Sequence, residues 1–224
     1  MNLSFEDAPA RSHMDDDLIK WRCNKPNYEV VNKLYLKERS KTHKPNSVEK
    51  KIENLMKTFE MELTNKKNPK EWKSVAYDVF KMQINGGKYF SADELADVGS
   101  YNVLLADAPL YKTTDEKQEI LHGQYKEAFP GGFAWEVLEV ISGPPVVTFT
   151  WRHWARWTGP FKGVSPSGER VEMKGCAIAT VNENLQVEEL KVYYDPNPIL
   201  ATLLKLNTGT DEGATRCPFH KSMK

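Results

Sequence analysis

The hydrophobic pattern of the C-terminal half of the chain predicts a meandering antiparallel sheet. Four runs of aromatic and β-branched residues follow one another, and turns rich in Gly, Pro and Asn separate them. The predicted strands cover residues 133–141, 146–157, 169–181 and 185–194. Everything before this sheet reads as helices and a hairpin that cover one of its faces.

An amphipathic helix is predicted in the N-terminal half. Apolar residues recur at spacings of three and four from residue 48 to residue 63, namely Val48, Ile52, Leu55, Phe59 and Leu63. Ser47 precedes the first of them and is a suitable N-cap. The pattern therefore predicts a helix with one apolar face.

Turn and cap signals predict the remaining elements. They are a hairpin over residues 72–84 and 88–90, a short helix over residues 92–98 and a third helix over residues 116–128. Asn85 and Gly86 form the strongest short hairpin signal, and Ser91 is placed to cap the short helix. Residues 28–37 fit either a strand or a short helix.

Composition divides the chain into one domain with two polar ends. We expect an N-terminal arm over residues 1–20, a single domain over residues 21–206 and a flexible tail over residues 207–224. Cys217 and His220 are residue types that bind metals, but two potential ligands on a tail are weak evidence for a site. We expect no metal and no cofactor.

Charge and cysteine usage exclude several classes of partner. The formal net charge of the 224-residue chain is zero, which gives no electrostatic reason to expect nucleic acid or an anionic membrane. No apolar run reaches the ~20 residues of a membrane span, and the acidic N-terminus lacks a signal-peptide pattern. The three cysteines are far apart, so neither disulfides nor a zinc site is expected, and we predict a cytoplasmic protein.

Alternation along the second predicted strand sorts its residues into two faces. One face is mostly apolar with a single titratable group, and it consists of Phe149, Trp151, His153, Ala155 and Trp157. This composition suits the wall of a pocket, although aromatic residues are more often plain core packing. On the last strand, Tyr193 and Asp195 share a face opposite Tyr194, and the pattern leaves open which face looks inward.

Several turns and strand ends resemble those of the SnoaL-like polyketide cyclases, a family of the nuclear transport factor 2-like superfamily. The similar segments are residues 130–137, 158–163, 166–168 and 193–195, which read PGGFAWEV, TGPFKG, PSG and YYD. Helices followed by long antiparallel strands are also the element order of that superfamily. The resemblance implies an α+β cone, with helices packed on a curved antiparallel sheet that encloses a pocket.

The chain resembles plant and fungal pathogen-related proteins of this superfamily more closely still, over roughly residues 20–205. The similar segments are Trp21-Arg22, residues 28–33, Ser142-Gly-Pro-Pro145, Arg152-His-Trp154 and residues 159–163. Many members of the superfamily pair through their sheets, so the resemblance implies a homodimer. It also implies a small apolar or polyketide-like ligand.

The resemblance implies a cofactor-independent cyclase or isomerase that acts on a polyketide-like substrate in secondary metabolism, for example in α-pyrone ring closure. Asp195 matches the acid/base aspartate of the cyclases, and an apolar cavity raises the pKa of a carboxyl towards neutrality. His153 is the second candidate, as a proton shuttle, and Tyr193 is the third. The family often carries a histidine where this chain has Trp157, which departs from the cyclase pattern.

Each predicted site residue also has a structural interpretation. An Asp before Pro is a common turn residue, a lone histidine on an apolar face is often a core residue, and tyrosines at a strand end usually pack. The predicted substrate-binding residues are Phe149, Trp151, Trp157, Tyr194 and Arg152. The alternative functions are a non-catalytic binding protein for an apolar small molecule in defence or stress, and a purely structural dimer.

Overall fold

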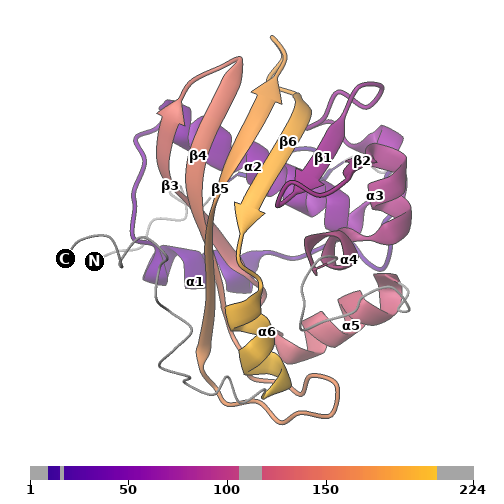
Figure 1. The fold of residues 1–224 in the computed structure, drawn as a ribbon, viewed down its shortest axis with the longest axis vertical. Helices are drawn as coiled ribbons and strands as arrows, with labels where there is room; N and C mark the ends of the chain where they lie inside the picture. Colours follow the sequence, from indigo (N-terminus) through magenta and orange to yellow (C-terminus); the bar gives the residue numbers. More distant parts are fainter. Residues whose placement is uncertain (1–9, 16–17, 106–117, 206–224) are drawn as a thin grey trace, which may run out of the picture.

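The computed structural model describes residues 10–15, 18–105 and 118–205 of the chain. Helices pack on one curved sheet, and the long helix α2 (Val48–Asn65) runs behind the strands (Figure 1). The predicted α+β fold, with helices packed on a curved and largely antiparallel sheet, is confirmed.

The sheet contains six strands in the order β2-β1-β6-β5-β4-β3. Their bounds are β1 Lys81–Ile84, β2 Tyr89–Ser91, β3 Ala134–Ser142, β4 Val146–Arg156, β5 Arg170–Val181 and β6 Val187–Tyr194. Neighbouring strands are antiparallel, except that β1 runs parallel to β6. The prediction of four consecutive strands is therefore confirmed as β3 to β6, with ends that agree within two residues.

The helices are α1 Glu29–Glu38, α2 Val48–Asn65, α3 Ala92–Val98, α4 Ser100–Leu105, α5 Gln118–Ala128 and α6 Asn197–Leu204. The Ser47 side chain accepts a hydrogen bond from the Lys50 amide at the start of α2, as predicted. At α3, Ser91 and Glu94 form a reciprocal capping box. None of the helices in these described ranges is long and apolar enough to span a membrane.

Three parts of the chain differ from the predicted elements or were left open. The segment of residues 28–37, which fits a strand or a helix, is helical and belongs to α1, and α4 lies in a segment for which no element was predicted. Helix α6 was not predicted, because its short apolar run follows two prolines and reads as a turn. Residues 115–117, where the third helix was expected to begin, lie outside the described ranges.

The first strand of the predicted hairpin is much shorter than expected, and that prediction is wrong over residues 72–80. Only Lys81–Ile84 forms a strand, β1. The preceding segment is held by Glu62 of α2, whose Oε2 accepts hydrogen bonds from the Ser74 amide at 2.9 Å and the Ser74 hydroxyl at 2.6 Å. The Ser74 amide is thus satisfied by a carboxylate and is not available for strand pairing. The segment is joined to the sheet only by a bridge between Val75 and Val187 of β6 within the described ranges.

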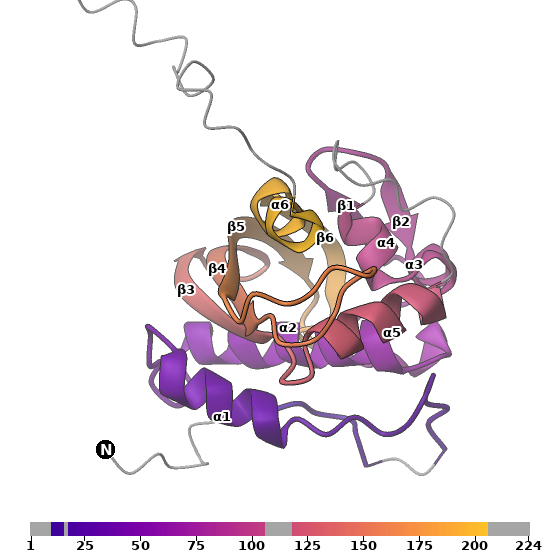
Figure 2. The same ribbon diagram turned by 90° about the horizontal axis from the view of Figure 1, so that it is seen from below.

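Side chains from α2 and the inner face of the sheet form the main apolar cluster. The face contributes, among others, Phe149, Trp151 and Ala177, which pack with Met56 and Phe59. These side chains occupy the space between α2 and the middle of the sheet. Figure 2 shows α2 lying along one side of the sheet, with α1 beyond it.

A second apolar cluster lies at the lower end of the sheet in Figure 1. It joins α5 and α6 to the strand ends, with Leu121, Leu200, Trp157 and Phe161 fully or almost fully buried. A third, smaller cluster packs Tyr35 of α1 against Trp154, with ring centroids 6.5 Å apart. Both faces of β4 are thus covered at this end.

Candidate functional site

His153 lies on the inner face of β4, between the main cluster and the second cluster. Its neighbours on that face are Trp151, which belongs to the main cluster, and Ala155, which belongs to the second. Met173, its register partner on β5, packs against both clusters. The histidine therefore occupies the junction of two apolar regions.

The His153 ring faces a carboxylate of helix α2. Its Nε2 lies 3.7 Å from Glu60 Oε1, and its side chain is only 20% exposed. Within the described ranges this Nε2 is buried and has no hydrogen-bond partner. Burial lowers the pKa of His153, the nearby Lys57 adds to this effect, and Glu60 opposes it. The imidazole is therefore neutral at neutral pH, and one ring nitrogen is free to accept a proton.

Glu60 connects this buried imidazole to the surface. Its side chain is 41% exposed, and α2 places it on the helix face that also carries Glu53 and Lys57. Tyr28 and Tyr101 lie near the same carboxylate. Burial raises the pKa of both phenols, and the negative charge of Glu60 raises it further.

Aromatic rings line the site on the side of α4 and α5. Tyr101 stacks on Tyr125 with centroids 4.3 Å apart and an interplanar angle of 2°. Phe133 packs on the His153 ring at 4.9 Å and on Phe129 at 4.5 Å. The His153 ring is thus bordered by an aromatic cluster that runs from Phe133 through Phe129 towards α5.

The N-terminal segment, residues 10–15, lies over the charged face of α2. The Ala10 amide donates to Asn54 Oδ1 and the Ser12 amide donates to Thr58 Oγ1, each at 3.1 Å. Arg11 lies over the Tyr28 ring at 3.7 Å, and a hollow of about 510 Å³ opens between this segment and the start of α1. We call residues 10–15 the strap.

Asp195, the predicted acid/base residue, lies at the start of α6. Its Oδ1 accepts hydrogen bonds from the Asn197 amide at 2.9 Å and from Asn197 Nδ2 at 2.8 Å. The side chain is exposed. These bonds tie Asp195 to the helix end and not to His153, which is the arrangement of a capping turn residue.

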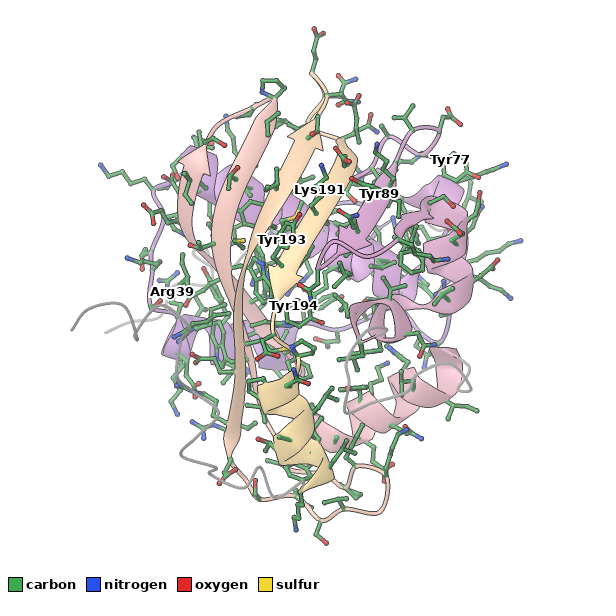
Figure 3. The ribbon with its side chains drawn as sticks, viewed as in Figure 1. Arg39, Tyr77, Tyr89, Lys191, Tyr193 and Tyr194 are labelled. Carbon is green, nitrogen blue, oxygen red and sulfur yellow. The ribbon has the colours of Figure 1, made fainter. Side chains whose placement is uncertain are left out.

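The two tyrosines of the last strand lie on opposite faces of the sheet. Tyr193 is 37% exposed on the outer face, opposite Cys176 of β5. Tyr194 is on the inner face, where its ring packs against Trp151 at 5.6 Å and its hydroxyl donates to the carbonyl of Leu104. Figure 3 shows Tyr193 beside Lys191 on β6, with Tyr194 at the end of the strand.

The remaining predicted binding residues also lie on opposite faces of the sheet. Phe149 and Trp151 are buried on the inner face of β4, and Trp157, the residue after that strand, is buried in the second cluster. Arg152 is on the outer face, where its Nε lies 2.7 Å from Glu136 and its Nη2 donates to the Glu38 carbonyl at 2.6 Å. The structure therefore brings His153 together with the apolar residues and separates it from Arg152 and Tyr193.

Sequence reasoning missed the residues that surround His153. They are Glu60 and Phe133, which contact or face its ring, Lys57, whose charge lowers its pKa, and Tyr28 and Tyr101, which lie near Glu60. The only available signal was the charged series Glu53, Lys57 and Glu60 at helical spacing, and such a series is typical of a solvated helix face. No group of three or more His, Cys, Asp or Glu suited to a metal occurs within the described ranges.

Comparison with known proteins identifies a close relative in a plant. The chain is 38% identical over 206 residues to the pathogen-related protein of Hordeum vulgare, which covers 88% of this chain and 87% of that protein. No protein-family model matches the chain.

Solved structures show only a distant likeness. AclR of Streptomyces galilaeus, described as a putative hydroxylase, is 20% identical, with a TM-score of 0.40 over 60% of this chain and 69% of that one. A putative SnoaL-like polyketide cyclase from Jannaschia sp. CCS1 is 18% identical, with a TM-score of 0.38 over 60% of this chain and 77% of that one. By its identity and coverage with the barley protein, the chain belongs to the pathogen-related protein family.

Proposed function

We propose that the chain is a cofactor-independent enzyme that cyclises or isomerises a polyketide-like carbonyl compound by acid/base catalysis. The observation that carries the proposal is the buried Nε2 of His153, which lies 3.7 Å from Glu60 Oε1 between two apolar clusters. A neutral imidazole beside a carboxylate is a competent general base in an apolar site.

In the proposed reaction, His153 removes a proton from the carbon next to a substrate carbonyl. The resulting enolate attacks a second carbonyl carbon of the same chain and closes the ring, or it is reprotonated elsewhere and the substrate isomerises. Glu60 stabilises the imidazolium that forms meanwhile. The imidazolium then returns its proton to the product oxygen or carbon, so the enzyme ends in its starting state.

The aromatic border of the site supports a conjugated substrate. Phe133 and Tyr101 offer ring faces beside the acid/base pair. A conjugated poly-β-keto chain spreads its own enolate charge and stacks on such rings. An α-pyrone would form where the enolate oxygen attacks the terminal carboxyl carbon of the chain and that carbon loses its hydroxyl as water.

Variants of the acid/base pair test the proposal. Wild type, His153→Asn and Glu60→Gln would be incubated with linear poly-β-keto acids, and ring closure followed by mass and absorbance. We expect a loss of ~100-fold or more for His153→Asn, with ligand binding retained, and a smaller loss for Glu60→Gln. Glu183→Gln, at an exposed carboxylate in the turn between β5 and β6, is the matched control.

Asp195→Asn separates the two acid/base assignments. A large loss in Asp195→Asn with His153→Asn active would transfer the role to the residue that the family resemblance indicates. Binding by wild type without turnover of any substrate in the panel would contradict the enzyme and support a carrier of an apolar molecule.

The proposal includes a homodimer that forms through the outer face of the sheet. Supporting this, the outer side chains of β6 remain partly or well exposed, with Tyr193 at 37% and Lys191 at 31%. Glu189 lies 3.4 Å from both Lys81 and Lys191, so the face carries both charges and is self-complementary. A cytoplasmic location and a place in secondary metabolism remain predictions.

A further inference from the structure

Two lysines associated with α2 are almost fully buried, but they have different partners. Lys57 and Lys66 each expose 1% of their surface. The Lys66 Nζ lies 2.8 Å from Glu62 Oε1 and donates to the Glu71 carbonyl at 3.2 Å, so its charge is matched. The Lys57 Nζ instead lies 4.1 Å from the centre of the Tyr35 ring.

The acidic residue one turn before Lys57 is already engaged by other donors. Glu53 Oε1 accepts a hydrogen bond from the Tyr35 hydroxyl at 2.8 Å, and Oε2 accepts one from the Val137 amide at 3.2 Å. The Lys50 Nζ lies 3.6 Å from the same Oε1. Among the residues that the structure describes, Glu53 therefore serves other partners, and no salt bridge joins it to Lys57.

Burial makes the neutral form of Lys57 accessible near neutral pH. Desolvation lowers the pKa of Lys57 to about 7, and the positive charge of Arg11 in the strap contributes, while Glu53 and Glu60 oppose the shift. Lys50 acts in the same direction as Arg11. A neutral lysine has a free lone pair, and desolvation is one of the ways in which enzymes activate a lysine as a nucleophile.

Lys57 is also adjacent to the proposed acid/base pair. It lies three residues before Glu60 on the same face of α2, and its charge contributes to the lowered pKa of His153. The Lys57 amine is thus close enough to the His153 imidazole and the Glu60 carboxylate for their charges to influence one another. These three groups are the set that imine chemistry with a carbonyl compound requires.

We propose that Lys57 is a nucleophilic amine that forms an imine with the carbonyl group of a ligand bound at the His153–Glu60 site. This inference rests on the proposed function and deepens it, because it assigns the substrate class to ketones and β-diketones. Lys57 is only 1% exposed, and the strap is bonded to α2 at Asn54 and Thr58, so we expect the ligand to reach the amine when the strap moves aside.

The step is balanced without an oxidant or a reductant. The Lys57 nitrogen adds to the carbonyl carbon, the carbonyl oxygen takes up a proton from solvent, and the nitrogen loses one to His153. The carbinolamine then expels its hydroxyl as water with the proton from the imidazolium, and a protonated imine remains. His153 removes a proton from the neighbouring carbon of the protonated imine and gives an enamine, the nucleophile for ring closure.

Acetylacetone is a suitable probe, because a neutral amine converts it into a conjugated enaminone that absorbs in the near ultraviolet. The full-length protein would be incubated with acetylacetone, and the adduct followed by absorbance, intact mass and peptide mapping. We expect modification at Lys57 well before Lys66, the equally buried lysine that is paired with Glu62. The rate at Lys57 should level off above pH about 7, whereas exposed lysines keep gaining reactivity up to about pH 10.

Two variants complete the test. Lys57→Met removes the amine with little change in volume, and Lys57→Arg keeps a positive charge without the nucleophile, so one of them remains informative if the other fails to fold. Both should abolish the early adduct. Equal labelling of Lys57 and Lys66, or an undiminished early adduct in Lys57→Met, would overturn the inference.

Different experimental outcomes would contradict the imine inference and the proposed function. Turnover by wild type without any Lys57 adduct would leave acid/base catalysis in place and remove the imine. A Lys57 adduct that persists in His153→Asn, with no turnover by wild type, would support the amine and contradict the enzyme.

Discussion

At the scale of single residues, environment changes the chemistry of ordinary side chains. His153 and Lys57 are both buried near the charged face of α2, and burial lowers the pKa of each. A buried charge that lacks a close partner costs stability, whereas Lys66 recovers much of that cost from Glu62. The molecule therefore keeps Lys57 at a thermodynamic disadvantage, as proteins often do at functional sites.

This disadvantage predicts the effect of pH on stability. Between pH about 7 and the ordinary lysine value of about 10.5, folded Lys57 binds fewer protons than unfolded Lys57, so its contribution to stability rises with pH. Lys57→Met should be more stable than wild type at pH 7 by about 2–4 kcal/mol, and the gain should shrink towards pH 10.

Urea unfolding of wild type and Lys57→Met between pH 6 and pH 10 measures this difference. Lys66→Met is the matched control, because it removes one member of a buried ion pair and should destabilise the fold. A Lys57→Met variant less stable than wild type at pH 7 would show that the lysine is a stabilising core residue.

At the scale of elements, the Glu62 carboxylate of α2 holds the segment that follows the helix through hydrogen bonds. Glu62 accepts from the Ser74 hydroxyl, from the amides of Lys73 and Ser74, and from Lys66. This network holds the amides of Lys73 and Ser74, and the pairing of residues 72–80 with the sheet is limited to a bridge between Val75 and Val187 of β6. The element boundary therefore depends on a helix that precedes it in the chain.

Glu62→Ala should lower the free energy of unfolding by about 3–5 kcal/mol, because it leaves a buried lysine and several buried donors unpaired. Denaturant unfolding at neutral pH checks this. Lys51→Ala, at an exposed position of the same helix, should change stability by less than about 0.5 kcal/mol. A loss below about 1 kcal/mol for Glu62→Ala would mean that water replaces the network.

At the scale of the whole molecule, the two faces of the sheet differ in what covers them. The inner face is buried under α2, while the β6 end of the outer face carries the partly exposed Lys191 and the exposed Tyr193 (Figure 3). This asymmetry is the basis for expecting a dimer through the outer face.

Charge reversal tests the dimer. Lys191→Glu places like charges beside Glu189 on both copies and should convert a dimer to a monomer, as measured by light scattering over a concentration series. Lys51→Glu on α2 should leave the mass unchanged. A monomeric wild type at every concentration would end this proposal.

Much of the fold could be predicted from the sequence because its signals are local. Alternation and turn residues gave β3 to β6, and the spacing of Ile52, Phe59 and their neighbours gave α2. The parallel pairing of β1 with β6 joins segments about a hundred residues apart, and no local pattern reports it. Helix α6 is short and follows two prolines, so its packing and not its propensity makes it a helix.

The candidate site was predictable only in part. Alternation grouped His153 with Phe149, Trp151 and Trp157, and the structure buries this group on one face. Alternation does not indicate which face of β6 turns inward. The structure places Tyr194 on the inner face and Tyr193 on the outer face. Successive side chains of a strand point to opposite faces, so the sequence defines two faces. Which face becomes the interior depends on the element that packs against the sheet.

The sequence by itself determined the strands, the main helix, their caps and the family, because each depends on neighbouring residues or on similarity along the chain. Only the tertiary structure decided that Glu60 faces His153 and that Lys57 is buried over the Tyr35 ring. On an isolated helix their spacing indicates a solvated face, and here the strap, α1 and β4 lie against that part of α2. The structure also shows that Asp195 accepts hydrogen bonds from Asn197, because an aspartate that precedes a helix can accept from groups in the first turn of that helix.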